Sequence, residues 1–445
     1  MKLKGKLLLL ALIIISGVGG YLYYKGLINF NEPKVIFEKK PEYVGSNTNL
    51  KFRIIDDKPG IKEVKVYLIQ EKNIKILEDI DFPEGFNEKD YNIKIDARKY
   101  GLKEGNGKIS IFVKDSSLLG NSKTITLEIK VDLTPPSLSI LSSPASIMNG
   151  GTGFVFYRTS SDVIKTGIRV GNLEFNCFNS IAENKNIFGC AFPYPYYWNR
   201  KKSIVVFAID KAGNKTSHAL MYYFKRKNYH RSVITITDEF IETKVRPLSD
   251  KDISDPVKLF KYVNVEVRKK NEDLIHNIAK KVSLKEPLFK TNFLQLKNSK
   301  MLGGFADYRK YKYKGKFIKG ANAYHKGMDF ASIKNATVQA AEDGKVVYTG
   351  FLGIYGNSII IEHGMGVFTL YSHLAEIHVN KGDMVSRGTE IGITDTTGLA
   401  VGDHLHFGVL VQGLEVHPIE WLDRKWLNSR FFSEYKRIKT IYGGQ

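Results

Sequence analysis

The chain has 445 residues, of which 43% are hydrophobic and 25% charged, and its formal net charge is +21. This length predicts about three globular domains with sizeable cores. The positive charge raises the question of nucleic-acid binding, but no predicted helix carries a dense basic stripe, and the N-terminal residues predict export. We therefore expect no nucleic acid as a partner. The charge is better interpreted as a basic surface that faces an anionic cell wall or membrane.

Residues 1–27 are predicted to form a cytoplasmic tip and a membrane anchor. An uncharged run extends from Leu7 to Tyr24, and as a helix it would span about 27 Å, enough for a bilayer core. The lysines before this run predict that the N-terminus stays in the cytoplasm. A cleaved signal peptide is the alternative, since the small residues 16–20 suit a protease, but no Ala-x-Ala site follows. We favour a single-pass anchor in the bacterial cytoplasmic membrane, with the body in the periplasm or outside the cell.

Residues 34–135 and 136–228 are predicted to form two immunoglobulin-like sandwiches in tandem. Both contain strand-like runs separated by turn residues. The loop Asp115–Asn121 recurs as Asp210–Asn214, and the offset of about 95 residues is an ordinary length for a sandwich. The two modules resemble the immunoglobulin-like modules of bacterial surface proteins, with the stiff segment Thr134-Pro135-Pro136 as their boundary. Ligand binding is the alternative role, but we favour that of a spacer or of regulatory packing.

The two cysteines of the chain, Cys177 and Cys190, both lie in the second predicted sandwich. Outside the cytoplasm such a pair is expected to be oxidised. A disulfide across so short a loop would contribute about 3 kcal/mol in the chain-entropy account. Zinc binding by this pair is not expected, because no histidine lies close to it in the sequence.

Residues 229–300 are predicted to form a helical connector. Asp255 and Pro256 form a helix start, with a capping side chain followed by proline at the first helical position. Apolar residues then recur at helical spacing as far as Val282, which predicts a face that packs against the C-terminal domain. A basic, Tyr-rich run follows at Tyr308–Tyr313. From the residues alone it could line a substrate groove or cover a metal.

Histidines are concentrated in the last part of the chain. Seven of the 10 lie at or beyond His325. The run Gly402–Val411 has the composition of a strand, in which side chains alternate between faces, so His404 and His406 share one face. Such a pair can also be merely solvated. Two further elements favour a site, however: His325 precedes Asp329 by four residues, and His373 ends an apolar run. A carboxylate with two imidazoles is a donor set for Zn²⁺ that leaves a fourth position open for water.

These residues and their surroundings resemble the lysostaphin-like (LytM-type) zinc endopeptidases, which cut peptidoglycan peptides. The resemblance covers about residues 301–430, including the segments 338–347, 353–361 and 379–385. It implies an all-β peptidase domain at residues 301–430. It also implies hydrolysis of peptide bonds in peptidoglycan stem peptides or cross-links.

The resemblance further implies a role for each member of the histidine and aspartate set. His325, Asp329 and His406 would hold the zinc, and His373 and His404 would form the unliganded catalytic pair. The pair would take a proton from water or stabilise the oxyanion, with the division of these roles left open. Asp395 departs from the family pattern, which usually has glycine there, so its side chain could charge the rim of the groove.

The predicted fold class is therefore multidomain and mainly β, with an N-terminal membrane helix, two sandwiches, a helical connector and a C-terminal peptidase. His363 is expected in a hairpin turn, and His378 and His417 are expected at the surface. One alternative function is a catalytically quiet, peptidoglycan-binding or amidase-activating envelope protein of the same fold. Another is an adhesin or scaffold in which the sandwiches are the working part. An envelope regulatory protein is a further conceivable partner.

Overall fold

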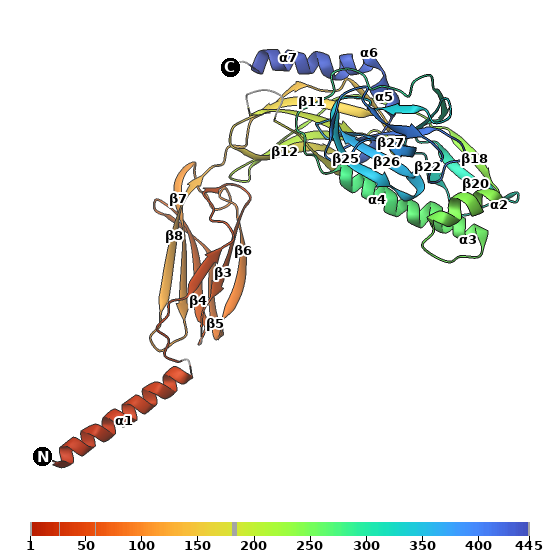
Figure 1. Ribbon diagram of the computed structural model, residues 1–445. Coiled ribbons are helices and arrows are strands. Elements are labelled where there is room, and N and C mark those ends of the chain that lie inside the picture. Colours follow the sequence, from red (N-terminus) through yellow and green to blue (C-terminus); the bar gives the residue numbers. More distant parts are fainter. Residues whose placement is uncertain (1, 26, 58, 180–184, 444–445) are drawn as a thin grey trace. The chain divides into compact units, whose positions relative to one another are not determined.

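The computed structural model describes residues 2–25, 27–57, 59–179 and 185–443. The fold is mainly β, with 44% strand and 19% helix, as the sequence predicts. The chain divides into two compact units, which Figure 1 shows together. The first contains residues 1–136, 162–165 and 209–216, and the second contains 137–161, 166–208 and 217–445.

The chain begins with helix α1 (Lys2–Tyr24), drawn in red in Figure 1. Its segment Gly5–Tyr24 has a mean hydropathy of 2.0 and is unburied within the protein. A helix of this length and composition fits a single-pass membrane anchor. A signal sequence has the same properties, so the choice between the two stays a prediction.

The rest of the first unit contains two sheets. One orders the strands β1 (Lys34–Phe37), β3 (Thr48–Ile55) and β6 (Glu88–Ile95), and the other β2 (Tyr43–Val44), β8 (Ser122–Val131), β7 (Gly105–Asp115), β4 (Ile61–Gln70) and β5 (Asn73–Phe86). Leu50 and Ile93 from the first sheet share one buried cluster with Val66 and Ile111 from the second. The alternation of buried and exposed residues along these strands explains this two-layer core. Its immunoglobulin-like topology stays a prediction.

The segment from Ser137 to Lys225 also forms sheets. They order the strands β14 (Ile187–Pro193), β11 (Thr152–Thr159) and β9 (Leu138–Ser142); then β13 (Leu173–Asn176), β12 (Val163–Val170), β15 (Ile204–Asp210) and β16 (Lys215–Ala219); and β10 (Ser146–Met148) with β17 (Tyr223–Lys225). We call the part of this segment that belongs to the second unit the middle module. Immunoglobulin-like topology is a prediction here too.

The predicted disulfide between Cys177 and Cys190 is wrong for this structure, in which both residues are free thiols. The Sγ of Cys190 donates a hydrogen bond to the backbone oxygen of Asn176 at 3.0 Å. Burial raises the pKa of the Cys190 thiol well above its ordinary value. The thiol form is therefore favoured, and it is a poor nucleophile for disulfide exchange. Spacing along the chain does not reveal whether two sulfur atoms reach bonding distance.

The middle module shares its core with the C-terminal domain. Phe154 on β11 packs against Trp421 and Phe431, with ring centroids 5.9 and 4.9 Å away. The backbone amide of Thr152 donates to the carboxylate of Glu420 at 2.8 Å. The side-chain amide of Gln412 donates to two backbone oxygens of the module at 2.8 Å each. The module and the domain therefore form one packed body.

The predicted connector consists of a strand followed by helices. Its elements are β18 (Arg231–Ile236), α2 (Asp238–Phe240), the π-helix η1 (Ile241–Val245), the 3-10 helix η2 (Arg246–Leu248), α3 (Pro256–Lys261), the π-helix η3 (Tyr262–Val267) and α4 (Arg268–Ala279). As predicted, Asp255 caps α3, accepting from the amide of Lys258 at 2.7 Å. Phe260 and Ile275 are buried against residues of the C-terminal domain. The strand β18, which was not predicted from the sequence, pairs in parallel with the Tyr-rich strand β20 (Tyr308–Tyr313).

The C-terminal domain is built on one large sheet beside the small sheet of β18 and β20. The small sheet also contains β21 (Lys316–Phe317) and β22 (Ala323–Tyr324). The large sheet orders β19 (Lys300–Gly303), β23 (Met328–Ala331), β30 (Leu405–Val411), β27 (Val367–Ile377), β26 (Asn357–Glu362), β25 (Gly344–Phe351) and β28 (Met384–Val385), with β24 (Thr337–Gln339), β29 (Glu390–Thr394) and β31 (Leu414–Val416) paired alongside. The 3-10 helix η4 (Gly353–Tyr355) precedes β26, and the chain ends with α5 (Pro418–Leu422), α6 (Arg424–Leu427), the π-helix η5 (Asn428–Phe432) and α7 (Ser433–Tyr442).

Candidate metal centre

Three adjacent strands, β23, β30 and β27, bring the predicted site residues together. Asp329 on β23 lies directly opposite His406 on β30, and Ser372 on β27 lies opposite His406 on the other side. Side chains of directly opposed residues lie on one face of the sheet and touch. The alternation that places His406 toward Asp329 turns Leu405 and Phe407 into the buried core.

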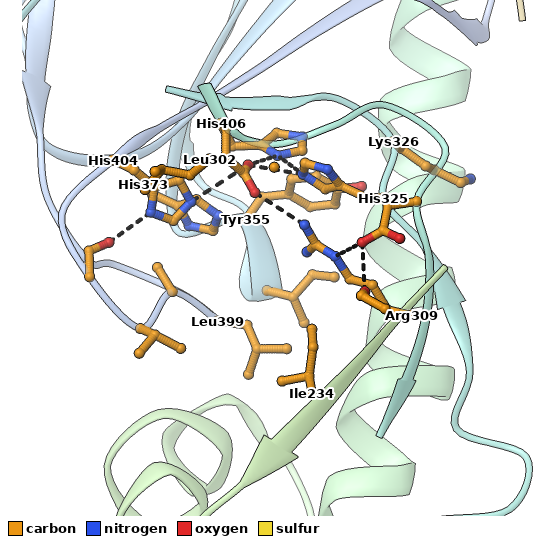
Figure 2. A pocket seen from close by; sticks show the side chains of 18 of the residues that line it. Ile234, Leu302, Arg309, His325, Lys326, Tyr355, His373, Leu399, His404 and His406 are labelled. Atoms are coloured by element: carbon orange, nitrogen blue, oxygen red, sulfur yellow. Dashed lines mark hydrogen bonds and ion pairs between the residues drawn. The ribbon is translucent and has the colours of Figure 1, made fainter. Parts of the chain in front are cut away.

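His325, Asp329 and His406 present one ligand atom each to a common point (Figure 2). The Nε2 of His325 lies 2.9 Å from Oδ1 of Asp329 and 3.0 Å from Nδ1 of His406. The Nδ1 of His406 lies 3.0 Å from the same carboxylate oxygen. The three predicted ligands are thus assembled in one cluster. Two imidazole nitrogens and one carboxylate oxygen suit a zinc ion with an open position.

The hydrogen bonds around this cluster fit a bound cation. The Nδ1 of His325 donates to the backbone oxygen of Gly304 at 2.8 Å, so its Nε2 turns a lone pair toward the carboxylate. The Nε2 lone pair of His325 and the carboxylate oxygen Oδ1 of Asp329 therefore lie 2.9 Å apart with no proton between them. A cation between them would satisfy both.

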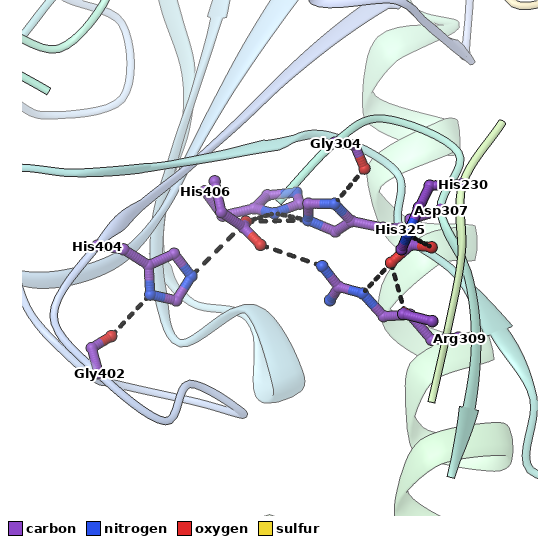
Figure 3. A network of polar contacts seen from close by, with 10 residues as sticks. His230, Gly304, Asp307, Arg309, His325, Gly402, His404 and His406 are labelled. Carbon is purple, nitrogen blue, oxygen red and sulfur yellow. Dashed lines mark hydrogen bonds and ion pairs between the residues drawn. The ribbon is translucent and has the colours of Figure 1, made fainter. Parts of the chain in front are cut away.

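Arg309 holds the second oxygen of the Asp329 carboxylate (Figure 3). Its Nη2 lies 3.2 Å from Oδ2 of Asp329, and its Nε lies 3.4 Å from Oδ2 of Asp307. Asp307 also accepts from the Ser232 hydroxyl at 2.7 Å and lies 3.1 Å from Nδ1 of His230. A chain of polar contacts thus leads from the connector strand to the metal cluster. Arg309 and Tyr311 of the run Tyr308–Tyr313 line the pocket, but the sequence alone did not reveal this role of Arg309.

Lys326 anchors the loop that carries His325. Its ammonium group lies 2.9 Å from a carboxylate oxygen of Glu272 on α4 and 3.3 Å from one of Glu415 on β31. These carboxylates raise the pKa of Lys326 above its ordinary value despite its burial. Glu415 in turn lies 2.6 Å from Nε2 of His276 on α4. The connector helix is therefore tied to the residue next to a candidate ligand.

His373 and His404 lie side by side next to the ligand cluster, with ring centroids 4.8 Å apart (Figure 2). The Nδ1 of His373 donates to the backbone oxygen of Thr397 at 2.7 Å, and that of His404 to Gly402 at 2.7 Å. In the neutral form of each imidazole, Nε2 therefore carries no proton and can accept one. The Nε2 of His404 lies 3.6 Å from Oδ1 of Asp329, so this pair borders the point where the ligands meet.

The backbone around this pair is unusual. His373 has a φ of 63°, a left-handed conformation that is uncommon for a residue with a side chain. Burial, together with His404 and His406, lowers the pKa of His373 to about 3. The imidazole is therefore neutral at neutral pH. The amide of Asp395 donates to the backbone oxygen of His373 at 2.8 Å, and Asp395 also forms a bridge with His404. Asp395 thus contributes backbone bonds that hold the pair together.

The cluster lies in a pocket with a volume of about 740 Å³. Apolar residues of the connector, among them Ile234 and Phe260, line the pocket together with Leu399 and Val401. Ile234 lies across the pocket from the histidines (Figure 2). The predicted packing face of the connector therefore continues as a wall of the pocket.

The remaining C-terminal histidines differ in their surroundings. His378 is exposed, as predicted. His363 is buried, with its nitrogens 2.8 Å from the backbone oxygen of Asp343 and 2.7 Å from the hydroxyl of Thr369, and it has no place in the pocket lining. The prediction that His417 lies at the surface is wrong. It is buried beneath the middle module, where it caps α5 and lies 3.0 Å from the ammonium of Lys227.

Comparison with known proteins places this site in a family. Residues 323–418 match the model of Peptidase family M23. The chain therefore carries an M23 (LytM-type) peptidase domain in its C-terminal part, as the sequence predicts. That domain contains His325, Asp329, His373, His404 and His406.

Two curated relatives illustrate the similarity. The chain is 41% identical over 98 residues to the peptidoglycan DD-endopeptidase ShyA of Vibrio cholerae. The aligned region covers 22% of this chain and 23% of ShyA. The chain is 38% identical over 95 residues to the DD-carboxypeptidase/endopeptidase Mpg of Neisseria meningitidis, covering 21% and 22%. The aligned part thus spans less than a quarter of each relative. Among solved structures, the catalytic domain of lysostaphin from Staphylococcus simulans is 29% identical, covering 30% of this chain and 98% of that domain with a TM-score of 0.26.

Proposed function

We propose that this protein is a zinc-dependent endopeptidase that hydrolyses peptide bonds in the stem peptides or cross-links of peptidoglycan. The observation that carries the proposal is the assembly of His325, Asp329 and His406 around one point, with a second pair of histidines beside it. The M23 match supports the reaction class. The names of the curated relatives support the substrate.

The donor set assigns zinc to His325, Asp329 and His406, where the ion would polarise the scissile carbonyl and lower the pKa of water. The residues of the chain supply the proton transfers. His373 and His404 each give their Nδ1 proton to a backbone oxygen, so their Nε2 atoms can accept a proton from the attacking water. Once protonated, the same nitrogen can donate to the departing amine or face the oxyanion. Apolar side chains of the connector, among them Ile234 and Phe260, line the pocket in which these transfers would take place.

The proposal places the domain in the bacterial envelope. The helix Gly5–Tyr24 would hold the protein in the cytoplasmic membrane with its body outside, where peptidoglycan lies. A catalytically quiet member of the same fold would have lost one of the five site residues or their geometry, whereas all five are present and assembled here. An envelope regulatory protein would remain a natural partner for the modules outside the peptidase domain.

The direct test is mass spectrometry of purified peptidoglycan after incubation with the zinc-loaded full chain in detergent. We expect new peptide termini in the stem or cross-link, with the glycan strands left intact. The His373→Ala variant, loaded with zinc in the same way, is the matched control and should release new termini about 10²–10⁴-fold more slowly. Peptidoglycan that stays intact with the zinc-loaded wild type, or glycan cleavage in place of peptide cleavage, would contradict the proposal.

A further inference from the structure

A second groove opens beside the metal pocket, with a volume of about 760 Å³. His230 lines both cavities, so they are neighbours that meet at this residue. One wall comes from the middle module at Tyr196 and Tyr197, and the other from Tyr308 and Tyr324 of the C-terminal domain. All of these residues belong to one compact unit. The groove leads from the middle module to the metal centre.

Four tyrosine rings form a continuous row along this groove. The centroids of Tyr197 and Tyr196 are 5.3 Å apart, those of Tyr196 and Tyr324 are 5.2 Å apart, and those of Tyr324 and Tyr308 are 5.0 Å apart. Tyr197 is 54% exposed and Tyr324 is 39% exposed, so both rings offer surface to a ligand. Tyr324 directly precedes the candidate ligand His325. A molecule lying on the row would therefore reach the metal pocket.

The charged side chains that line the groove are basic. Arg226, Arg231 and Lys310 line it together with the amides of Asn199 and Asn228, and no acidic residue is among its described lining. The guanidinium of Arg231 lies over the ring of Tyr308, 6.0 Å from its centroid. Aromatic rings, amides and positive charges are thus combined within one groove. This combination suits a ligand with ring faces, polar substituents and nearby carboxylates.

The groove is held in shape by Asn149, whose side chain is buried. Its Nδ2 donates to the backbone oxygens of Tyr196 at 3.1 Å and Lys227 at 3.0 Å. Its Oδ1 accepts from the amide of Lys227 at 2.7 Å. One buried side chain thus joins the two segments that line the groove on the side of the middle module. A preformed groove binds with a smaller entropy cost than one that must be ordered by its ligand.

We propose that this groove binds the glycan strand of peptidoglycan and so delivers the attached stem peptide to the metal pocket. Sugar rings present C–H faces that stack on tyrosine, and their N-acetyl groups hydrogen-bond with side-chain amides. The carboxylates of stem peptides along the strand face the arginines and the lysine. The junction at His230 is where a peptide leaving the strand enters the pocket. This inference rests on the proposed function for its choice of polymer.

Binding of peptide-free glycan strands to the full chain in detergent tests the inference without any hydrolysis. We expect saturable binding by the wild type and an affinity about three- to tenfold lower for Tyr197→Ala, the usual effect of losing one stacking ring. Tyr223→Ala is the matched control, because Tyr223 is 69% exposed on the same module and lies outside the groove lining. Equal binding by wild type and Tyr197→Ala, or no binding by the wild type, would overturn the inference.

Hydrolysis then separates this inference from the proposed function. Tyr197→Ala should raise the KM for polymeric peptidoglycan about three- to tenfold and leave the cleavage of a sugar-free, cross-linked peptide dimer unchanged. If the wild type cleaves neither substrate, the proposed function fails, while strand binding still decides the role of the groove. If sugar-free peptides occupy the groove instead, so that Arg231→Ala weakens their binding and glycan strands do not compete, the groove is a peptide site and the inference is wrong.

Discussion

The guanidinium of Arg309 lies 3.2 Å from Oδ2 of Asp329, on the carboxylate oxygen that His325 and His406 leave unused. Each oxygen of this carboxylate therefore has its own partner. The arginine fixes the rotation of the carboxylate and directs Oδ1 toward the two imidazoles. Arg309 thus acts through Asp329 as a positioning residue for the metal centre.

Arg309→Met should lower the zinc affinity about 10- to 100-fold, the range found when partners of metal ligands are removed. The reason is that Asp329 would lose the ion pair that orients it. Zinc affinity can be measured by competition with a chelator, without reference to activity. Lys312→Met, on the same strand but outside the pocket lining, should bind zinc like the wild type. Unchanged affinity for Arg309→Met would show that the ion pair does not position the ligand.

Phe154→Ala should destabilise the peptidase domain although Phe154 belongs to the middle module. Its ring is 4% exposed and packs against Trp421 and Phe431. Removing such a ring from a core costs about 3–5 kcal/mol of unfolding free energy. Phe351→Ala, at a position that is 59% exposed, should cost far less. Thermal unfolding of both variants measures the difference, and equal melting temperatures would argue against a shared core.

Acid should destabilise the folded chain partly through His363. Burial lowers the pKa of His363 to about 4, below its ordinary value, so the unfolded state binds the proton first. Its stabilising contribution is complete above the unfolded pKa of about 6.5 and is lost as the pH falls toward the folded value. Stability measured from pH 7 to pH 4 should therefore fall less steeply for His363→Gln than for the wild type. Parallel curves would exclude His363 as a source of acid sensitivity.

Much of the candidate site could be predicted from the sequence, because most of its residues lie on a few short strands with a regular side-chain period. The two-residue period that places His404 and His406 on one face survives in the structure, and it orients Asp329 and His406 toward each other across β23 and β30. The positions of His325 before Asp329 and of His373 after an apolar run singled these residues out, and the lysostaphin-like resemblance supplied their roles, because no periodicity connects them to that strand. The mainly β fold and the packing face of the connector helices followed from the same patterns.

What the sequence did not reveal depends on contacts between distant segments. Arg309 appears in the sequence as one basic residue among several in a Tyr-rich run, and its role emerges only where β20 meets Asp329. His417 was expected at the surface because nothing local shows that the middle module covers it, where its backbone amide donates to Gly150. The disulfide failed for a similar reason, since the spacing of Cys177 and Cys190 does not fix the positions of their sulfur atoms. Tertiary packing decides all three.

The central claim is that three residues hold the metal while two others transfer protons. Zinc content by elemental analysis, measured beside peptidoglycan hydrolysis for single alanine variants, tests it most directly. Alanine at His325, Asp329 or His406 should remove most of the zinc, because two protein ligands hold the ion poorly. Alanine at His373 or His404 should leave the zinc in place and lower turnover about 10²–10⁴-fold. Loss of zinc from His404→Ala with retention in His406→Ala would invert the assignment, and wild-type hydrolysis by all five variants would contradict the account.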